Sequence, residues 1–254
     1  MLNLIKYEFT KKNKLIALIL IISIAINLFS IAKGPAGSVV FLSLFPMAIS
    51  ILYIVDILKM YSDDINKKSG YMLFMTPNSG YKIIVSKIIT AVIEGFAILL
   101  LYFIFILING SYIIYSAGTV INFNEIFDAI NALLSGSFGF NLGHVFLFLI
   151  TALLFLLSFL TTAYTAMTVR KSIFSEIKFG GALSFLIFLL ISWGLSSLSA
   201  EIFNLLTPLY DSYVARPTAT ELMYIFLPIN ALSIVQIVIL TICSGYLLEQ
   251  KINL

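Results

Sequence analysis

Charged residues are scarce in this sequence, and their scarcity excludes a soluble globular domain. Only 11% of the 254 residues are Asp, Glu, Lys or Arg, whereas 61% are hydrophobic and the mean hydropathy is +1.08. A soluble domain carries about 25% charged residues because its surface is hydrated. The composition therefore predicts an integral membrane protein in one domain spanning residues 1–254.

Residues that commonly carry chemistry are also scarce. The single cysteine, Cys243, excludes an internal disulfide, and we expect it to pack as a small apolar side chain. The single histidine, His144, cannot build the usual zinc site, and we expect it to anchor a helix at a membrane boundary. No phosphate-binding Gly-x-x-x-x-Gly-Lys-Ser/Thr motif is present. We therefore expect no catalytic, metal or cofactor residues in this chain.

Six apolar runs are long enough to cross a bilayer, since a spanning helix needs about 20 apolar residues. They predict an all-α membrane protein, with transmembrane helices at residues 15–32, 39–58, 88–108, 144–169, 179–198 and 223–248. The segment 59–87 is polar and is predicted to be a loop. The stretch 109–143 is rich in Gly, Ser, Asn and Phe, and we expect a loop with a short interfacial helix near residues 123–134.

The basic residues predict the orientation. Lys and Arg favour the cytoplasmic side during insertion. With the N-terminus inside, six spans leave only Lys33 and Arg216 of the 15 outside. We expect both termini in the cytoplasm, with the chain spanning a bacterial cell membrane several times. The expected cytoplasmic set is Lys6, Lys11, Lys12, Lys14, Lys59, Lys67, Lys68, Lys82, Lys87, Arg170, Lys171, Lys178 and Lys251.

Residues 1–14 are short, basic and amphipathic. Three apolar side chains share one side of a helical wheel, and lysines supply the positive charge, which is typical of an interfacial helix on anionic lipid. The alternative is the N-terminal region of a cleaved signal peptide, with a poor cleavage site at residues 30–32. The residues that define the interfacial helix are Leu2, Ile5, Lys6, Phe9, Lys11 and Lys12.

Two carboxylates lie inside predicted spans, short of the membrane midplane. Asp56 is near the cytoplasmic end of the second span, and Glu94 is about two turns into the third. Carboxylates at such depths are often functional. They would line an inner vestibule or join helices; alternatively, each is an interfacial carboxylate paired with a lysine such as Lys87 or Lys59.

The loop at 59–87 contains a five-residue apolar patch, residues 71–75, between Gly70 and Thr76-Pro77. An exposed apolar patch is costly unless something covers it. The loop therefore predicts a short helix that docks on a cytoplasmic partner, or alternatively one that lies on the inner leaflet. The docking residues are Lys67, Lys68, Gly70, Tyr71, Met72, Leu73, Phe74, Met75, Thr76 and Pro77.

In its basic segment 2–14 and its loop residues 67–77, the sequence resembles the permease subunits of ABC-2 type ABC transporters, which have the type V exporter fold. The resemblance implies that 1–14 is an elbow helix, that the loop holds the coupling helix, and that residues 199–227 form an external re-entrant hairpin. It also implies a partner ATPase that binds ATP and Mg²⁺, and a second permease subunit, identical or different. We expect lipid contact and no nucleic acid.

The function expected from this resemblance is ATP-driven export of an amphipathic or hydrophobic substrate, with a peptide or toxin as the first choice. The 22 Phe and 13 Tyr suit such cargo, although lipid-facing and core positions also use aromatics. The alternative is a non-transporting membrane protein for immunity or sensing. An intramembrane enzyme has little support, because no polar cluster lies at the predicted midplane.

The orientation is testable with single-cysteine variants on a Cys243→Ala background. We expect Lys33→Cys to react with a membrane-impermeant maleimide in intact cells and Lys171→Cys to react only after lysis, because the positive residues are retained inside. The opposite pattern of labelling would overturn the predicted orientation.

Overall fold

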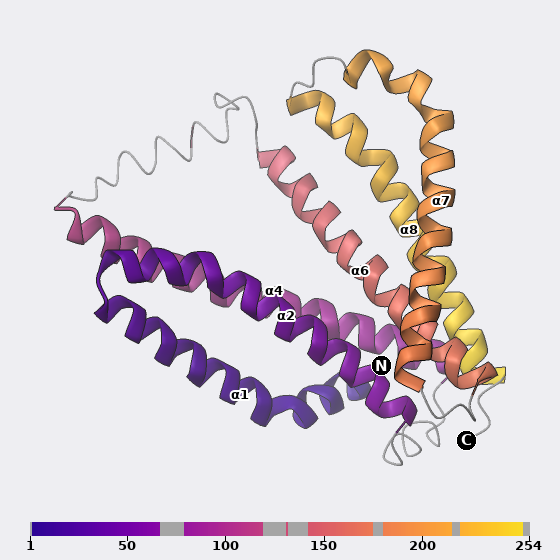
Figure 1. Ribbon diagram of the computed structural model, residues 1–254, viewed down its shortest axis with the longest axis horizontal. Coiled ribbons are helices and arrows are strands. Elements are labelled where there is room, and N and C mark those ends of the chain that lie inside the picture. Colours follow the sequence, from indigo (N-terminus) through magenta and orange to yellow (C-terminus); the bar gives the residue numbers. More distant parts are fainter. Residues whose placement is uncertain are drawn as a thin grey trace. The chain divides into compact units, whose positions relative to one another are not determined.

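The computed structural model describes residues 2–66, 79–118, 131, 142–174, 180–214 and 219–250, with the backbone alone for 206–214 and 219–225. Six long helices account for nearly all of them (Figure 1). They are α1 (Leu2–Ala32), α2 (Pro35–Asn66), α4 (Gly80–Ser116), α6 (Leu142–Ile173), α7 (Gly180–Val214) and α8 (Ala219–Gln250). The described residues contain no strand.

All six helices are long and apolar enough to cross a membrane. Among the described residues, the prediction of an all-α fold with six helices long and apolar enough to span a membrane is therefore confirmed. Even the shortest, α1 with 31 residues, measures about 46 Å at 1.5 Å per residue. Since the hydrocarbon core is about 30 Å thick, every helix has length to spare beyond it.

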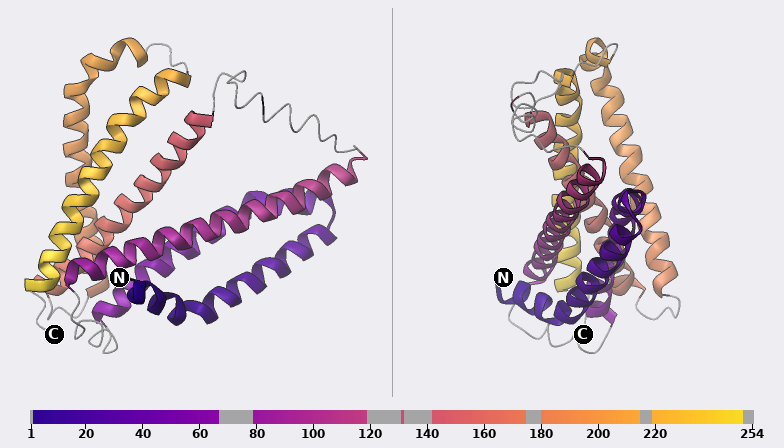
Figure 2. Two further views of the ribbon diagram at one scale, coloured as in Figure 1. Left: turned by 180° about the vertical axis from the view of Figure 1, so that it is seen from behind. Right: turned by 90° about the vertical axis from the view of Figure 1, so that its left-hand side faces the viewer.

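The helices extend past the predicted ends of the spans. α1 runs without interruption through the predicted elbow and first span, with a bend near its N-terminal end (Figure 2). Residues 59–66 of the predicted loop belong to α2, and residues 80–87 belong to α4. α7 continues beyond residue 198 to Val214. An elbow that lies on the membrane and a re-entrant hairpin stay predictions.

α4 also continues to Ser116, which corrects the loop predicted from residue 109. The polar side chains there are accommodated by the helix itself. Asn109 Nδ2 donates to the carbonyl of Phe105 at 2.9 Å, and Ser111 Oγ donates to that of Leu107 at 2.7 Å. The interfacial helix predicted near residues 123–134 falls outside the described residues apart from Asn131.

The chain divides into two compact units. The first contains α1, α2 as far as Asp63, and α4 from Val85. Its apolar core joins α2 to α4 through Phe41, Phe45 and Phe105, whose ring centroids are 5.0–5.3 Å apart. Tyr102 on α4 adds a hydrogen bond of 3.0 Å to the carbonyl of Leu42 on α2.

The second unit contains α6, α7 and α8 together with the adjoining ends of α2 and α4. α6 presents a buried row of threonines, Thr161, Thr165 and Thr168, which donate to carbonyls of their own helix at 2.7–2.9 Å. Thr165 Oγ1 also lies 3.3 Å from the carbonyl of Leu240 on α8. Small residues let helices approach closely within a membrane, and Thr165 lies where α6 meets α8.

The start of α4 packs against the end of α8 at Gly245, where a Cβ would overlap the ring of Tyr81. We expect Gly245→Ala to lower the stability by about 1–3 kcal/mol, because overpacking forces shifts in the neighbours. The matched control is Gly194→Ala in α7, where an added Cβ meets nothing within 4 Å. Thermal unfolding in detergent measures both, and equal melting temperatures would contradict the close packing.

Candidate functional site

Five charged side chains from three helices are gathered inside the first unit. α1 contributes Glu8 and Lys12, α2 contributes Asp56, and α4 contributes Lys87 and Glu94. Residues four apart share a helix face, and residues seven apart return to it after two turns. Glu8 and Lys12 are four residues apart on α1, and Lys87 and Glu94 are seven apart on α4. Each helix therefore presents one acid and one lysine to the other.

Lys12 is the centre of this group. Its Nζ lies 2.5 Å from Asp56 Oδ2 and 2.9 and 3.1 Å from the two oxygens of Glu94. An ammonium has three donors, and here each has an acceptor. The side chain of Lys12 is only 8% exposed. A single lysine thus joins α1 to both α2 and α4.

Lys87 and Glu8 form a second buried pair, with Nζ and Oε1 2.7 Å apart and side chains 1% and 3% exposed. This pair ties α1 to α4 one turn of α1 away from Lys12. We call the five residues Glu8, Lys12, Asp56, Lys87 and Glu94 the ion network. When all are charged, the ion network has three negative and two positive groups.

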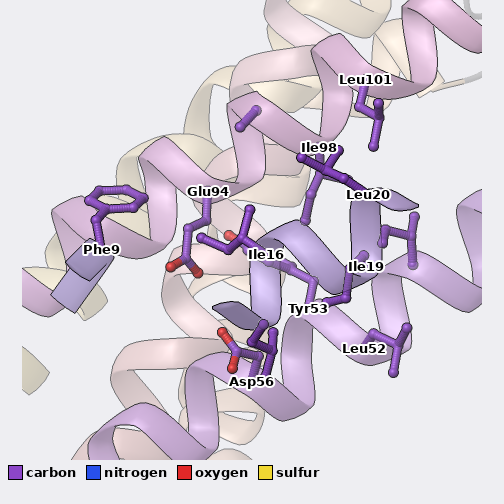
Figure 3. A pocket seen from close by; sticks show the side chains of 13 residues that line it. Phe9, Ile16, Ile19, Leu20, Leu52, Tyr53, Asp56, Glu94, Ile98 and Leu101 are labelled. Atoms are coloured by element: carbon purple, nitrogen blue, oxygen red, sulfur yellow. The ribbon is translucent and has the colours of Figure 1, made fainter. Parts of the chain in front are cut away.

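A cavity of about 300 Å³ adjoins the ion network within the same unit (Figure 3). Asp56 and Glu94 face it from α2 and α4, and Tyr53 completes its polar lining. The Tyr53 hydroxyl donates to the Ala91 carbonyl at 2.5 Å. The remaining lining is apolar: Phe9, Leu15, Ile16, Ile19, Leu20, Ile49, Leu52, Ala97, Ile98 and Leu101.

Asp56 and Glu94, which the sequence analysis singled out, are thus brought together by the fold. Both carboxylates are paired with a lysine, as the alternative expected, and that lysine belongs to a different helix from either of them. The alternative named Lys59 or Lys87 as the partner, but the shared partner is Lys12, and Lys87 contacts Glu8.

The prediction that Lys12 faces lipid headgroups is wrong, because its side chain is buried among carboxylates. Of the other predicted elbow residues, Leu2, Lys6 and Lys11 are exposed, Ile5 is half-buried, and Phe9 lines the cavity. Sequence reasoning missed Glu8. Its spacing of four residues from Lys12 was the available signal.

A second arrangement lies in the second unit, at the helix ends that flank residues 67–78. Arg170 Nη1 on α6 donates to Asn66 Oδ1, at the end of α2, at 2.7 Å. The backbone N–H of Gly80, at the start of α4, donates to Glu249 Oε1 on α8 at 2.9 Å. This contact satisfies one of the unpaired N–H groups of the first helical turn. Both flanking ends are therefore held by other helices.

The predicted coupling residues themselves, Lys67, Lys68, Gly70, Tyr71, Met72, Leu73, Phe74, Met75, Thr76 and Pro77, lie outside the described residues.

His144 is half-buried near the start of α6. Cys243 is exposed on α8, which corrects its expected packing role. Among the residues described, no group of three or more His, Cys, Asp or Glu could hold a metal ion.

The six long apolar helices indicate a multi-pass membrane protein. No family model, curated protein sequence or solved structure matches the chain. Its function must therefore be argued from its own residues.

Removing Lys12 should destabilise the protein strongly. Lys12→Met leaves the buried Glu94 and the partly buried Asp56 without a counter-charge, and breaking a buried ion pair costs about 3–5 kcal/mol. We expect a lower melting temperature in detergent than for Lys14→Met, which changes an exposed lysine of the same helix. The triple variant Lys12→Met, Asp56→Asn, Glu94→Gln should recover most of the loss. Equal melting temperatures for the two single variants would mean that Lys12 is not a structural centre.

Proposed function

We propose that this chain is the membrane-spanning permease subunit of an ATP-driven ABC exporter. The observation that carries the proposal is the attachment of both helix ends that flank residues 67–78. Asn66 is bound by Arg170 of α6, and Gly80 is bound by Glu249 of α8. A segment held in this way is suited to receive force from a partner and to pass it to several helices.

The force would enter at residues 67–78 and act on four helices. The Asn66–Arg170 contact involves α2 and α6, and the Gly80–Glu249 contact involves α4 and α8. Tyr81 packed on Gly245 strengthens the second connection. A partner that displaces the loop would therefore move the ends of α2 and α4 together with α6 and α8.

The same two helices lead to the ion network. α2 continues from Asn66 to Asp56, and α4 continues from Gly80 to Glu94, each as unbroken helix. Movement of the loop thus has a stiff route to the groups that hold α1. The permease works with a separate ATPase, which binds ATP and Mg²⁺, and with a second permease subunit, so this chain has no catalytic role of its own.

The resemblance in residues 2–14 and 67–77 supplies the rest of the proposal. The start of α1 acts as the elbow helix, residues 71–75 form the coupling helix, and both termini face the cytoplasm of a bacterial cell. The cargo is amphipathic or hydrophobic, with a peptide as the first choice. A protein for immunity or sensing shares the six helices but needs no ATPase.

The test is co-expression of the full chain with candidate ABC ATPase subunits from the same genome. We expect the wild type to co-purify with the ATPase and to stimulate ATP hydrolysis. Replacing residues 71–75 with serines should abolish both, because the apolar docking patch is lost, while membrane insertion is unchanged. The control is Tyr115→Ser, which alters an 82% exposed aromatic near the other end of α4.

A second variant separates docking from coupling. Glu249→Ala removes the acceptor for Gly80 but leaves residues 71–75 intact, so we expect association to survive and stimulation of ATP hydrolysis to fall. If the serine variant still binds and stimulates the ATPase, the coupling assignment is wrong. If no ATPase associates with the wild type, the exporter proposal fails in favour of a non-transporting role.

A further inference from the structure

We propose that the cavity between α1, α2 and α4 binds a small amphipathic monocation, namely a protonated primary amine with an apolar body. The inference goes beyond the exporter proposal and does not depend on it. It concerns binding to this chain alone, and it stands on the cavity, its charges and one unused acceptor.

The cavity is built as an apolar slot with a polar end. Glu94 and Asp56 lie toward that end, with Phe9 of α1 beyond Glu94, whereas Leu20 on α1 and Leu101 on α4 lie farther along the slot in the other direction (Figure 3). From Glu94 to Leu101 is two turns of α4, or about 10 Å. The volume of about 300 Å³ is at the lower limit for small-molecule sites. An extended alkyl or aromatic body of modest size matches this shape.

The five side chains of the ion network carry a net charge of −1 when all of them are ionised. Lys87 offsets Glu8, and Lys12 offsets only one of the two carboxylates that it contacts. With both carboxylates ionised, one negative charge remains beside the cavity. An isolated buried charge is unfavourable without a partner, so a ligand with a single positive charge is the complement.

One oxygen is placed to receive that ligand. Lys12 uses its three donors on both oxygens of Glu94 and on Oδ2 of Asp56. Within the part of the chain that is described, no donor contacts Oδ1 of Asp56, and this side chain is 22% exposed. A primary ammonium can donate to Oδ1 while its apolar body lies in the slot.

Other occupants fit less well. A bare metal cation seeks several oxygen ligands, and the polar lining supplies only Asp56, Glu94 and the Tyr53 hydroxyl. A lipid chain would fill the slot but would leave the negative charge uncompensated. The apolar length and the acidic end together favour the amphipathic amine.

The test uses two photoreactive probes on the full chain in phosphatidylcholine nanodiscs. Both carry the same alkyl diazirine, and one ends in a primary amine, the other in a hydroxyl group. Labelling of cavity residues is mapped by mass spectrometry and divided by labelling of Leu190, which is exposed on α7. This division corrects for different partitioning into the bilayer. We expect the amine to label the cavity at least about tenfold more, since hydrogen bonds to charged groups are the stronger ones.

Asp56→Asn removes the charge and keeps the shape, so the preference for the amine should disappear. Glu201→Gln, which changes an exposed carboxylate on α7, should keep it. Ala97→Leu fills the slot and should reduce labelling by both probes. Unaltered elution in size-exclusion chromatography shows that each variant is folded.

Three results would overturn the proposal. Equal labelling of the wild-type cavity by amine and alcohol would mean that the slot holds lipid chains without regard to charge. If Asp56→Asn still labels more strongly with the amine than with the alcohol, Asp56 is not the acceptor for the ammonium group. Unchanged labelling in Ala97→Leu would place the labelled site elsewhere.

Discussion

The ammonium group of Lys12 needs three acceptors inside a membrane domain, and this requirement organises the first unit. Burying an unpaired ammonium is costly, so the lysine is retained only where carboxylates surround it. Asp56 and Glu94 come from different helices, and both must approach α1 to reach the same nitrogen atom. The Lys87–Glu8 pair adds a second fixed point between α1 and α4. Apolar packing around Phe41, Phe45 and Phe105 then holds α2 and α4 together along their length.

The same demand for polar satisfaction applies to the second unit, where hydrogen bonds join the described helices. Lipid offers no hydrogen bonds, so each hydroxyl within a span must find a partner in the protein. Thr161, Thr165 and Thr168 use carbonyls of their own helix, which leaves α6 with a smooth face that α8 can approach. At the end of α8, Glu249 accepts the N–H of Gly80, which α4 itself cannot satisfy. Hydrogen bonds within and between helices thus support packing in the second unit, whereas charge pairs between helices do so in the first.

Hydropathy predicted the six helices because each apolar run is set by the thickness of the bilayer, a local property of sequence. Hydropathy could not predict where the helices end, because polar residues can also lie within a helix. In α4 the side chains of Asn109 and Ser111 donate hydrogen bonds to carbonyls of the same helix, and the helix continues past them. Asp56 and Glu94 were recognisable as unusual residues within spans. Their partner was not, because Lys12 is 44 and 82 residues away and looks like any lysine before a membrane segment. The only signal in the sequence was the spacing of Glu8 with Lys12 and of Lys87 with Glu94, which places one acid and one lysine on one face of α1 and of α4.

The loop and the cavity are connected by two stiff segments. Between Asp56 and Asn66 on α2, and between Gly80 and Glu94 on α4, the sequence contains neither proline nor a further glycine. Sharp kinks in helices arise at proline, at glycine and serine pairs, or where the hydrogen-bond ladder is interrupted. Neither segment therefore contains a residue at which helices commonly kink. Pro46 lies on the far side of Asp56 from the loop, so bending of α2 is expected beyond the cavity.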